Sequence, residues 1–527
     1  MTFDFPYSSQ TMPVMAKNIV ATSQPLAAQA GLNMLYRGGN AVDAVLAAAI
    51  TLTVVEPTSN GIGSDAFCIL WDGQSLHGLN ASGRSPASLT PERFEELEEM
   101  PYRGWDAVTV PGAVSAWTIL SRDYGTLPFE LLFEAAIQYA HDGFLVSPIT
   151  AKAWEKAPEI YRDFGSFKEG FLPRGRAPKG GELFRFPEQA KTLELIAQTK
   201  GEAFYRGTLA DAIAADAKKH GALLTKDDLA NHSADWVGTI SKAYGAVELH
   251  EIPPNGQGLA ALLMLGILKQ RDIKQYSIDS ADFLHLQIEA MKLAFADTYR
   301  YVADASSLDI DVGELLDDAY LAERAKLIDM SKAQNPSYGV PKPGGTVYLT
   351  AADESGMMVS FIQSNYAGFG SGVVVPKTGI SLQNRGAGFT LQKGHPNEVG
   401  GAKRPFHTII PAFVMGNGKP LMSYGVMGGP MQPQGHAQMI VRMFDFEQNP
   451  QTASDAPRWR VLGGLEVALE KGVNPEVLAE LERRGHVLHI ADLGTEFSYG
   501  GAQLIYKTDD GYIAGSDHRK DGHAVGF

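Results

Sequence analysis

The chain has 527 residues and a formal net charge of −15 at pH 7, from 45 basic and 60 acidic residues. This balance argues against nucleic acid or an anionic membrane surface as a main partner. Hydrophobic residues make up 44% of the chain and charged residues 20%, which predicts a substantial core and excludes global disorder. The length fits either more than one ordinary domain or one large layered α/β unit.

Cysteine usage and the apolar stretches indicate a cytoplasmic protein. Cys68 is the only cysteine, so no intrachain disulfide can form, and a buried thiol is the expected state. Residues 1–6 lack the basic start and apolar run of a secretory signal. The longest apolar stretch, 44–55, is too short to span a bilayer.

The first part of the chain predicts two helices followed by a β-hairpin. Ser23 and Asn40 each stand where an N-cap belongs, ahead of an alanine-rich apolar run. Asp72-Gly73 is a hairpin turn between two β-prone runs. We expect one helix over 25–35 and a second that begins after Asn40 and ends at about 54. The expected strands cover 66–71 and 75–80.

Helical periodicity dominates the middle of the chain, and β-prone runs dominate its end. The expected helices cover 129–141, 189–198, 208–220, 259–268 and 281–301. From 303 to 343 the pattern weakens and becomes acidic, then rich in Pro and Gly, which predicts a flexible arm. The expected strands after this arm cover 346–352, 357–363, 409–415 and 503–507.

The sequence Gly344-Gly345-Thr346 opens the first of these strands, and taken alone it is a glycine turn. The motifs that follow it, in this order, change that interpretation. They are Asn365, Gln383 to Gly388, Lys403-Arg404-Pro405, and Gly425 to Pro430. The ordered set resembles the second half of the gamma-glutamyltransferase family. Proteins of that family are N-terminal-nucleophile hydrolases, which cut themselves in front of a threonine and then use it.

The chemistry explains why such a chain must break before Thr346. A threonine hydroxyl is a weak nucleophile unless a base lies beside it. An N-terminal threonine carries its own base, an α-amine whose unperturbed pKa is about 8. Gly345 has no Cβ, which leaves its carbonyl open to attack by the Thr346 hydroxyl.

The resemblance covers nearly the full length and implies an α/β fold, the four-layer αββα sandwich of N-terminal-nucleophile hydrolases. It implies a large, mostly helical fragment, 1–345, and a small, strand-rich fragment, 346–527. These fragments are expected to remain together as a heterodimer, alone or in a higher oligomer. Neither a cofactor nor a metal is expected.

Site residues also follow from the resemblance. Gly428 and Gly429 match the oxyanion-hole glycines, where backbone N–H groups approach a developing oxyanion. Asn365 falls near the family's asparagine beside the nucleophile, and Arg84 lies close to its carboxylate-binding arginine. By themselves these residues fit equally a tight turn, an asparagine turn and a surface arginine.

Two segments depart from gamma-glutamyltransferases. Those enzymes hold the glutamyl ammonium with a Gln and an Asp, where this chain aligns Arg385 and Gly388. His407 and Thr408 replace a pair of serines, although His407 alone also fits a core histidine. Losing an acid and gaining a cation favours a purely anionic substrate. The residues expected to bind it are Arg84, Arg385, His407 and Thr408.

This pattern resembles the amidohydrolase and acylase branch of the superfamily. It implies hydrolysis of a small anionic amide, with oxamate from purine (allantoin) breakdown as the expected substrate. Gamma-glutamyl transfer or glutathione hydrolysis remains an alternative, as does a cephalosporin- or glutaryl-type acylase. A fold used only for binding is disfavoured by Thr346 together with Gly428 and Gly429.

Overall fold

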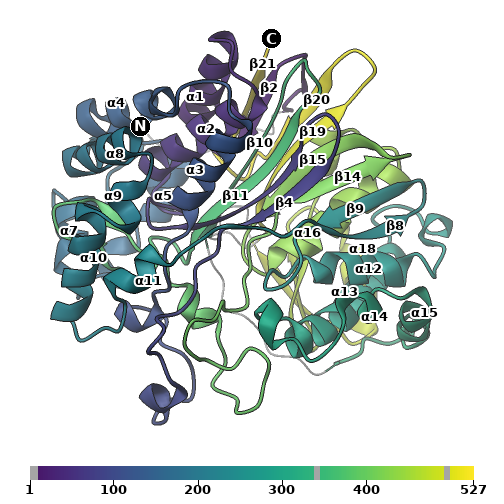
Figure 1. Ribbon diagram of the computed structural model, residues 1–527. Helices are drawn as coiled ribbons and strands as arrows, with labels where there is room; N and C mark the ends of the chain where they lie inside the picture. The colour runs from purple at the N-terminus through teal and green to yellow at the C-terminus, as the bar shows by residue number, and fades with distance from the viewer. Residues whose placement is uncertain (1–9, 337–344, 492–498) are drawn as a thin grey trace.

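A computed structural model describes residues 10–336, 345–491 and 499–527. Two seven-stranded antiparallel sheets form its centre, and Figure 1 shows helices flanking them. The β10 sheet has the order β21 (His523–Gly526), β2 (Ile19–Thr22), β10 (Gly345–Ala352), β11 (Met358–Tyr366), β3 (Asp65–Trp71), β4 (Leu76–Asn80) and β7 (Asp235–Trp236). The β15 sheet has the order β1 (Val14–Ala16), β20 (Tyr512–Ser516), β19 (Gly501–Lys507), β15 (Lys419–Met427), β14 (Ala412–Gly416), β9 (Val247–Glu251) and β8 (Ile240–Tyr244).

Helices pack on each sheet, and they come from different parts of the chain (Figure 1). The helices with the β10 sheet include α1 (Pro25–Tyr36), α2 (Ala41–Val55), α3 (Ala113–Tyr124), α4 (Glu134–Asp142), α8 (Pro187–Thr199) and α10 (Thr208–Lys219). The helices with the β15 sheet include α12 (Leu259–Leu268), α13 (Ala281–Tyr301) and α16 (Met431–Ile440).

Shorter elements complete the described chain. The helices are α5 (Pro148–Trp154), α6 (Ala157–Ile160), α7 (Gly165–Phe171), α9 (Glu202–Tyr205), α11 (Lys226–Ala230), α14 (Val312–Leu315), α15 (Asp318–Lys326), α17 (Pro450–Asp455) and α18 (Pro475–Arg483). The strands are β5 (Phe144–Leu145), β6 (Leu183–Phe184), β12 (Val374–Val375), β13 (Ile380–Ser381), β16 (Trp459–Gly463), β17 (Glu466–Glu470) and β18 (Val487–Ala491).

Strand β10 is buried on both faces, and its side chains divide between two apolar clusters. Val347 and Leu349 belong to the cluster that includes α2. Tyr348 belongs to a second cluster, which also contains Phe413 and Ile505 of the β15 sheet. Because successive strand residues point to opposite faces, β10 lies between a helical layer and the facing sheet. The part of the strand that directly follows Thr346 is therefore held by packing from both sides.

Most expected elements are present, and several have the expected bounds. Helices α12 and α13 span the predicted residues. Helix α2 begins with a capping box, in which Asn40 accepts from the backbone N–H of Asp43 and the Asp43 side chain accepts from the N–H of Asn40. The side chain that caps α1 is Gln24 and not Ser23, because the Ser23 hydroxyl donates to Glu56 instead.

Three other expectations need correction. The segment 129–141 is a 3₁₀ turn over Phe129–Phe133 followed by α4, and is not one continuous helix. The strand expected from 409 begins at Ala412, since Pro411 has no N–H to donate to a ladder. The flexible arm expected from 303 is wrong for residues up to 336, which include α14 and α15, with Leu321 buried against α12. Residues 337–343 of that arm lie outside the described residues.

None of the described helices combines the length and the apolar character needed to cross a membrane.

Candidate active site

Thr346 is buried near the start of β10, with 1% of its surface exposed. Its hydroxyl donates to the Ser364 Oγ of β11 at 3.1 Å. Gly345 pairs with Tyr366 and Val347 with Gln363, so the β10–β11 ladder is irregular at Thr346. A bulge of this kind re-aims a side chain and is common beside active sites.

The facing β15 sheet brings the Gly428-Gly429 corner towards Thr346. Thr350 Oγ1 and Ser423 Oγ lie 2.6 Å apart, and the Tyr348 ring lies against Gly425. These contacts show that β10 and β15 run in opposite directions, because the residue number along β10 falls from 350 to 348 while that along β15 rises from 423 to 425. The start of β10, with Thr346, and the end of β15, before Gly428, therefore lie at the same end of the two sheets.

The Gly428-Gly429 corner joins β15 to the N-terminus of α16, and its backbone needs glycine. Gly428 has φ 121° and Gly429 has φ 61°, both in the region that side chains disfavour. Their carbonyl oxygens accept from the backbone N–H groups of Met431 and Gln432. Gln257 Nε2 also donates to the Gly429 carbonyl at 2.9 Å and contacts the carbonyl of Thr408. This corner and the segment around Thr408 are therefore fixed by one side chain.

Arg385 supplies a buried cation to the same region. Its Nη1 donates to Thr408 Oγ1 at 2.8 Å, and its guanidinium carbon lies 4.9 Å from the centroid of the Tyr366 ring. Among the described residues, its Nε and Nη2 have no hydrogen-bond acceptor, and no carboxylate forms an ion pair with it. Burial lowers the pKa of Arg385 to about 10, so the group is still charged at neutral pH.

Tyr366 connects this cation to the start of β10, since it is the residue that pairs with Gly345. Its φ of 75° is unusual for a non-glycine residue and places the ring beneath the guanidinium. Strained backbone of this kind clusters at functional sites.

His407 and Asp65 form a fully buried pair next to the arginine. The His407 Nε2–H donates to Asp65 Oδ2 at 3.1 Å, while Asp65 Oδ1 accepts from the backbone N–H groups of Gly112 and Gly83. Burial raises the pKa of Asp65 to about 7, and the charge of Arg385 opposes this rise. Burial also lowers the pKa of His407, so its ring is neutral.

The contacts of Arg84 and Asn365 are with residues other than Thr346 and Arg385. The side chain of Arg84 is 44% exposed and forms an ion pair with Asp304 at 3.0 Å. Asn365 is buried, and its amide accepts from the Ser64 hydroxyl at 2.9 Å and reaches the Ser381 hydroxyl at 3.4 Å. The Thr346 hydroxyl contacts Ser364, the residue before Asn365.

The structure thus brings together Thr346, the glycine corner, Thr408, His407 and Arg385. Sequence reasoning missed the residues that connect them, namely Ser364, Tyr366, Asp65 and Gln257. The position of Ser364 directly before Asn365 was the one feature of the sequence that could have indicated its place in the site. No local pattern links Asp65 to a histidine more than 300 positions away.

Comparison with known proteins now identifies the family. The family described as "Gamma-glutamyltranspeptidase" matches residues 27–527. The chain belongs to the gamma-glutamyltranspeptidase family.

Relatives in this family match nearly end to end. The chain is 37% identical over 518 residues to an oxamate amidohydrolase proenzyme of Klebsiella pneumoniae, covering 95% of this chain and 97% of the relative. It is 36% identical over 522 residues to the glutathione hydrolase-like YwrD proenzyme of Bacillus subtilis, covering 97% and 98%. The crystal structure of a cephalosporin acylase from Bacillus halodurans is 48% identical, with a TM-score of 0.95 and coverage of 100% and 99%.

The structure also accounts for the glycine at 388, where a gamma-glutamyltransferase-type acid is missing. A Cβ built on Gly388 lies 2.5 Å from the Phe406 carbonyl oxygen. A side chain therefore cannot be added there without moving backbone. This family member excludes an acid at that position by packing as well as by sequence.

We predict that Gly429→Ala lowers turnover about a hundredfold or more, the typical effect of losing one oxyanion donor. The added Cβ strains a backbone at φ 61° and twists the amides at the corner. Steady-state kinetics on cleaved, folded protein measure the effect. Gly418→Ala is the matched control, because Gly418 also has positive φ but lies in an exposed turn. Equal turnover of both variants removes the oxyanion assignment.

Proposed function

We propose that this protein is a self-processing amidohydrolase whose nucleophile is Thr346, built on the four-layer αββα fold of N-terminal-nucleophile hydrolases. Cleavage before Thr346 divides it into residues 1–345 and 346–527, which remain together as a heterodimer. The family membership supports self-processing, since several relatives are described as proenzymes. The two facing sheets with helices packed on each support the fold.

Self-cleavage needs a nucleophile beside a carbonyl carbon. In the proposed step, the Thr346 oxygen attacks the Gly345 carbonyl carbon, the Gly345–Thr346 C–N bond breaks, and the threonine nitrogen takes up the hydroxyl proton. This step frees the Thr346 amine, and water then hydrolyses the resulting ester, which frees the Thr346 hydroxyl and leaves a carboxylate on Gly345. The hydrogen bond to Ser364 orients this hydroxyl before the reaction.

The freed amine then serves as the base for amide hydrolysis. It accepts the Thr346 hydroxyl proton as the oxygen attacks the substrate amide, and the N–H groups at Gly428 and Gly429 hold the oxyanion. Return of the proton to the leaving nitrogen releases ammonia or an amine and leaves an ester on Thr346. A water molecule, deprotonated by the same amine, completes the cycle.

The proposed class of substrate follows from the environment of Arg385. A buried cation with two unpaired donors is costly in a protein interior unless an anion binds to it. Each charge-assisted hydrogen bond to a carboxylate contributes about 1.5–3 kcal/mol. We therefore propose a substrate whose acyl part carries a carboxylate and no ammonium, with oxamate as the first choice.

A second candidate is an acylase for a longer carboxylate-bearing acyl group, such as a glutaryl amide. The 48% identity to a cephalosporin acylase structure favours it. The two candidates differ in distance, because the oxamate carboxylate is bonded directly to the scissile carbonyl. A glutaryl carboxylate lies several bonds away, so its Arg partner must lie farther from Thr346.

We predict that the purified wild-type protein is found as two fragments, with a 182-residue small fragment (527 − 345) that begins at Thr346. Thr346→Ala is expected to remain a single 56.8 kDa chain, because alanine has no oxygen to attack Gly345. Intact mass measurement distinguishes the two. A fully active wild-type enzyme in one uncleaved chain contradicts the mechanism.

We also predict that Arg385→Ala reduces kcat/KM for the anionic amide at least about tenfold, the equivalent of one charge-assisted contact. Arg84→Ala is the matched control, because the exposed Arg84 is paired with Asp304 and should leave kcat/KM nearly unchanged. Kinetics on oxamate, a glutaryl amide and glutathione measure both effects and rank the two candidates.

The substrate panel tests charge independently of cleavage. Oxamate or the glutaryl amide is expected to react well ahead of glutathione, whose ammonium would approach Arg385. Comparable activity on γ-glutamyl substrates, or wild-type kinetics for Arg385→Ala, removes the anionic pocket but leaves the Thr346 mechanism intact.

A further inference from the structure

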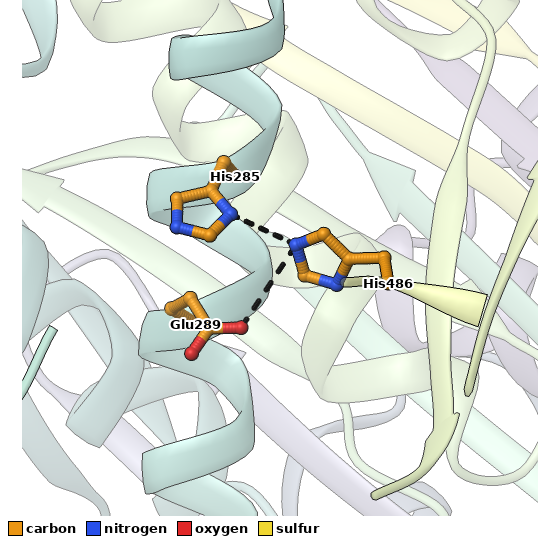
Figure 2. A group of neighbouring side chains, drawn as sticks. All are labelled: His285, Glu289 and His486. Carbon is orange, nitrogen blue, oxygen red and sulfur yellow. Dashed lines mark hydrogen bonds and ion pairs between the residues drawn. The ribbon is translucent and has the colours of Figure 1, made fainter. Parts of the chain in front are cut away.

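A second group of buried titratable side chains lies between α13 and the turn that follows α18. His285, Glu289 and Lys292 lie along α13, and His486 comes from the turn between α18 and β18 (Figure 2 draws all but the lysine). One ligand atom each of His285, Glu289 and His486 lies within 4.8 Å of the others. Two histidines and a glutamate are also a typical zinc ligand set, so the group must be tested as a metal site.

The hydrogen bonds of the two histidines define one direction of proton donation. Lys292 Nζ, which can only donate, lies 3.4 Å from His486 Nδ1. His486 therefore carries its proton on Nε2 and donates it to His285 Nδ1 at 2.8 Å. His285 in turn carries its proton on Nε2 and donates to the Asp329 carbonyl at 2.9 Å. Burial lowers the pKa of His486 to about 3, which agrees with a neutral ring.

The charged pair in this group, Glu289 and Lys292, also has a partner for each of its donors and acceptors. Besides His486, Lys292 donates to Glu289 Oε1 at 2.9 Å and to the Gln334 carbonyl at 3.0 Å. Glu289 Oε2 accepts from the Gln334 backbone N–H at 3.0 Å. All three ammonium donors, both carboxylate oxygens and all four imidazole nitrogens therefore have partners.

This saturation argues against a metal. A divalent ion between these ligands must displace the His285–His486 hydrogen bond and lie beside Glu289, next to an existing cation. One carboxylate would then face three buried positive charges, an arrangement that low-dielectric surroundings penalise strongly. A ligating His486 Nε2 would also leave an N–H on Nδ1 that faces the Lys292 donors.

The partners of this group belong to the segment that leads to the cleavage point. Asp329 and Gln334 precede Gly345 by 16 and 11 positions in the chain. The same segment contacts the small fragment, since the Ala333 N–H donates to the Arg484 carbonyl at 2.7 Å. His486 also belongs to residues 346–527, whereas α13 belongs to residues 1–345.

We propose that His285, Glu289, Lys292 and His486 form a metal-free anchor that holds residues 329–334. These positioning residues fix the segment ahead of the Gly345–Thr346 bond for self-cleavage, and afterwards they bind the end of the large fragment to the small one. The inference rests on the proposed self-cleavage for its first role. The local order of residues 329–334, on which both roles depend, can be measured without cleavage.

The first test measures the rate of cleavage. The double variant Glu289→Gln/Lys292→Met removes both charges together, so no buried charge is left unpaired. We expect fragment formation, followed by intact mass from the time of synthesis, to slow about tenfold or more through loss of positioning. Arg300→Met/Asp309→Asn is the matched control, because it removes an exposed ion pair of α13 and should cleave at the wild-type rate.

The second test uses Thr346→Ala, which cannot cleave. Hydrogen exchange at the amides of Ala333 and Gln334 is expected to speed up in the double variant, with protection in β10 and β15 unchanged. If the double variant fails to fold, His285→Asn serves instead, because it keeps an acceptor near His486 and loses only the bond to the Asp329 carbonyl.

The outcomes separate the two proposals. A wild-type protein that never cleaves contradicts the proposed function, while faster exchange at Gln334 still supports the anchor. Normal cleavage with unchanged exchange in the double variant overturns the anchor. Stoichiometric zinc in wild-type protein from metal-supplemented culture, lost in His486→Gln, overturns the metal-free assignment, and we expect none.

Discussion

A buried arginine with unpaired donors is the constraint on which the candidate site depends. Arg385 receives partial compensation from the Tyr366 ring, the Thr408 hydroxyl and the nearby Asp65 carboxyl. None of these gives it an ion pair, so the surrounding backbone must hold a charged group that favours an anion. The positive φ of Tyr366 and the bulge opposite Thr346 are part of that arrangement. The strained strand and the buried cation are therefore two parts of one structure.

The pair of Asp65 and His407 explains how this cation is tolerated before any substrate binds. Asp65 provides negative charge at a distance, but its two oxygens are occupied by backbone N–H groups and by His407. It can therefore lower the energy of the cation without filling the donors that a substrate carboxylate needs. A glutamate or aspartate has no room at position 388, because a Cβ there lies 2.5 Å from the Phe406 carbonyl oxygen.

Local patterns in the sequence were sufficient for the bounds of some helices, such as α12 and α13, but not for every helix. Asn40 at its capping box and the apolar run of α12 needed no tertiary information. The expectation for 303–336 failed because α15 has few apolar residues and is held by Leu321 against Gly266 of α12. Motifs in the sequence name Thr346 and Arg385 as candidate site residues, and both are buried. Ser364, Asp65 and Gln257 act through contacts between distant strands, which no spacing in the chain reveals.

Residue type and burial alone would have misassigned both the group around His285 and the surroundings of Arg385. His285, Glu289 and His486 have the composition of a metal site, whereas Arg385 resembles an interior arginine of the core. The hydrogen-bond partners of each group lead to the opposite assignments. Every polar atom of the first cluster has a partner within the chain, so it stabilises the chain and has nothing left to bind a ligand. Arg385 keeps two donors without an acceptor among the described residues, so they are available to bind an anion.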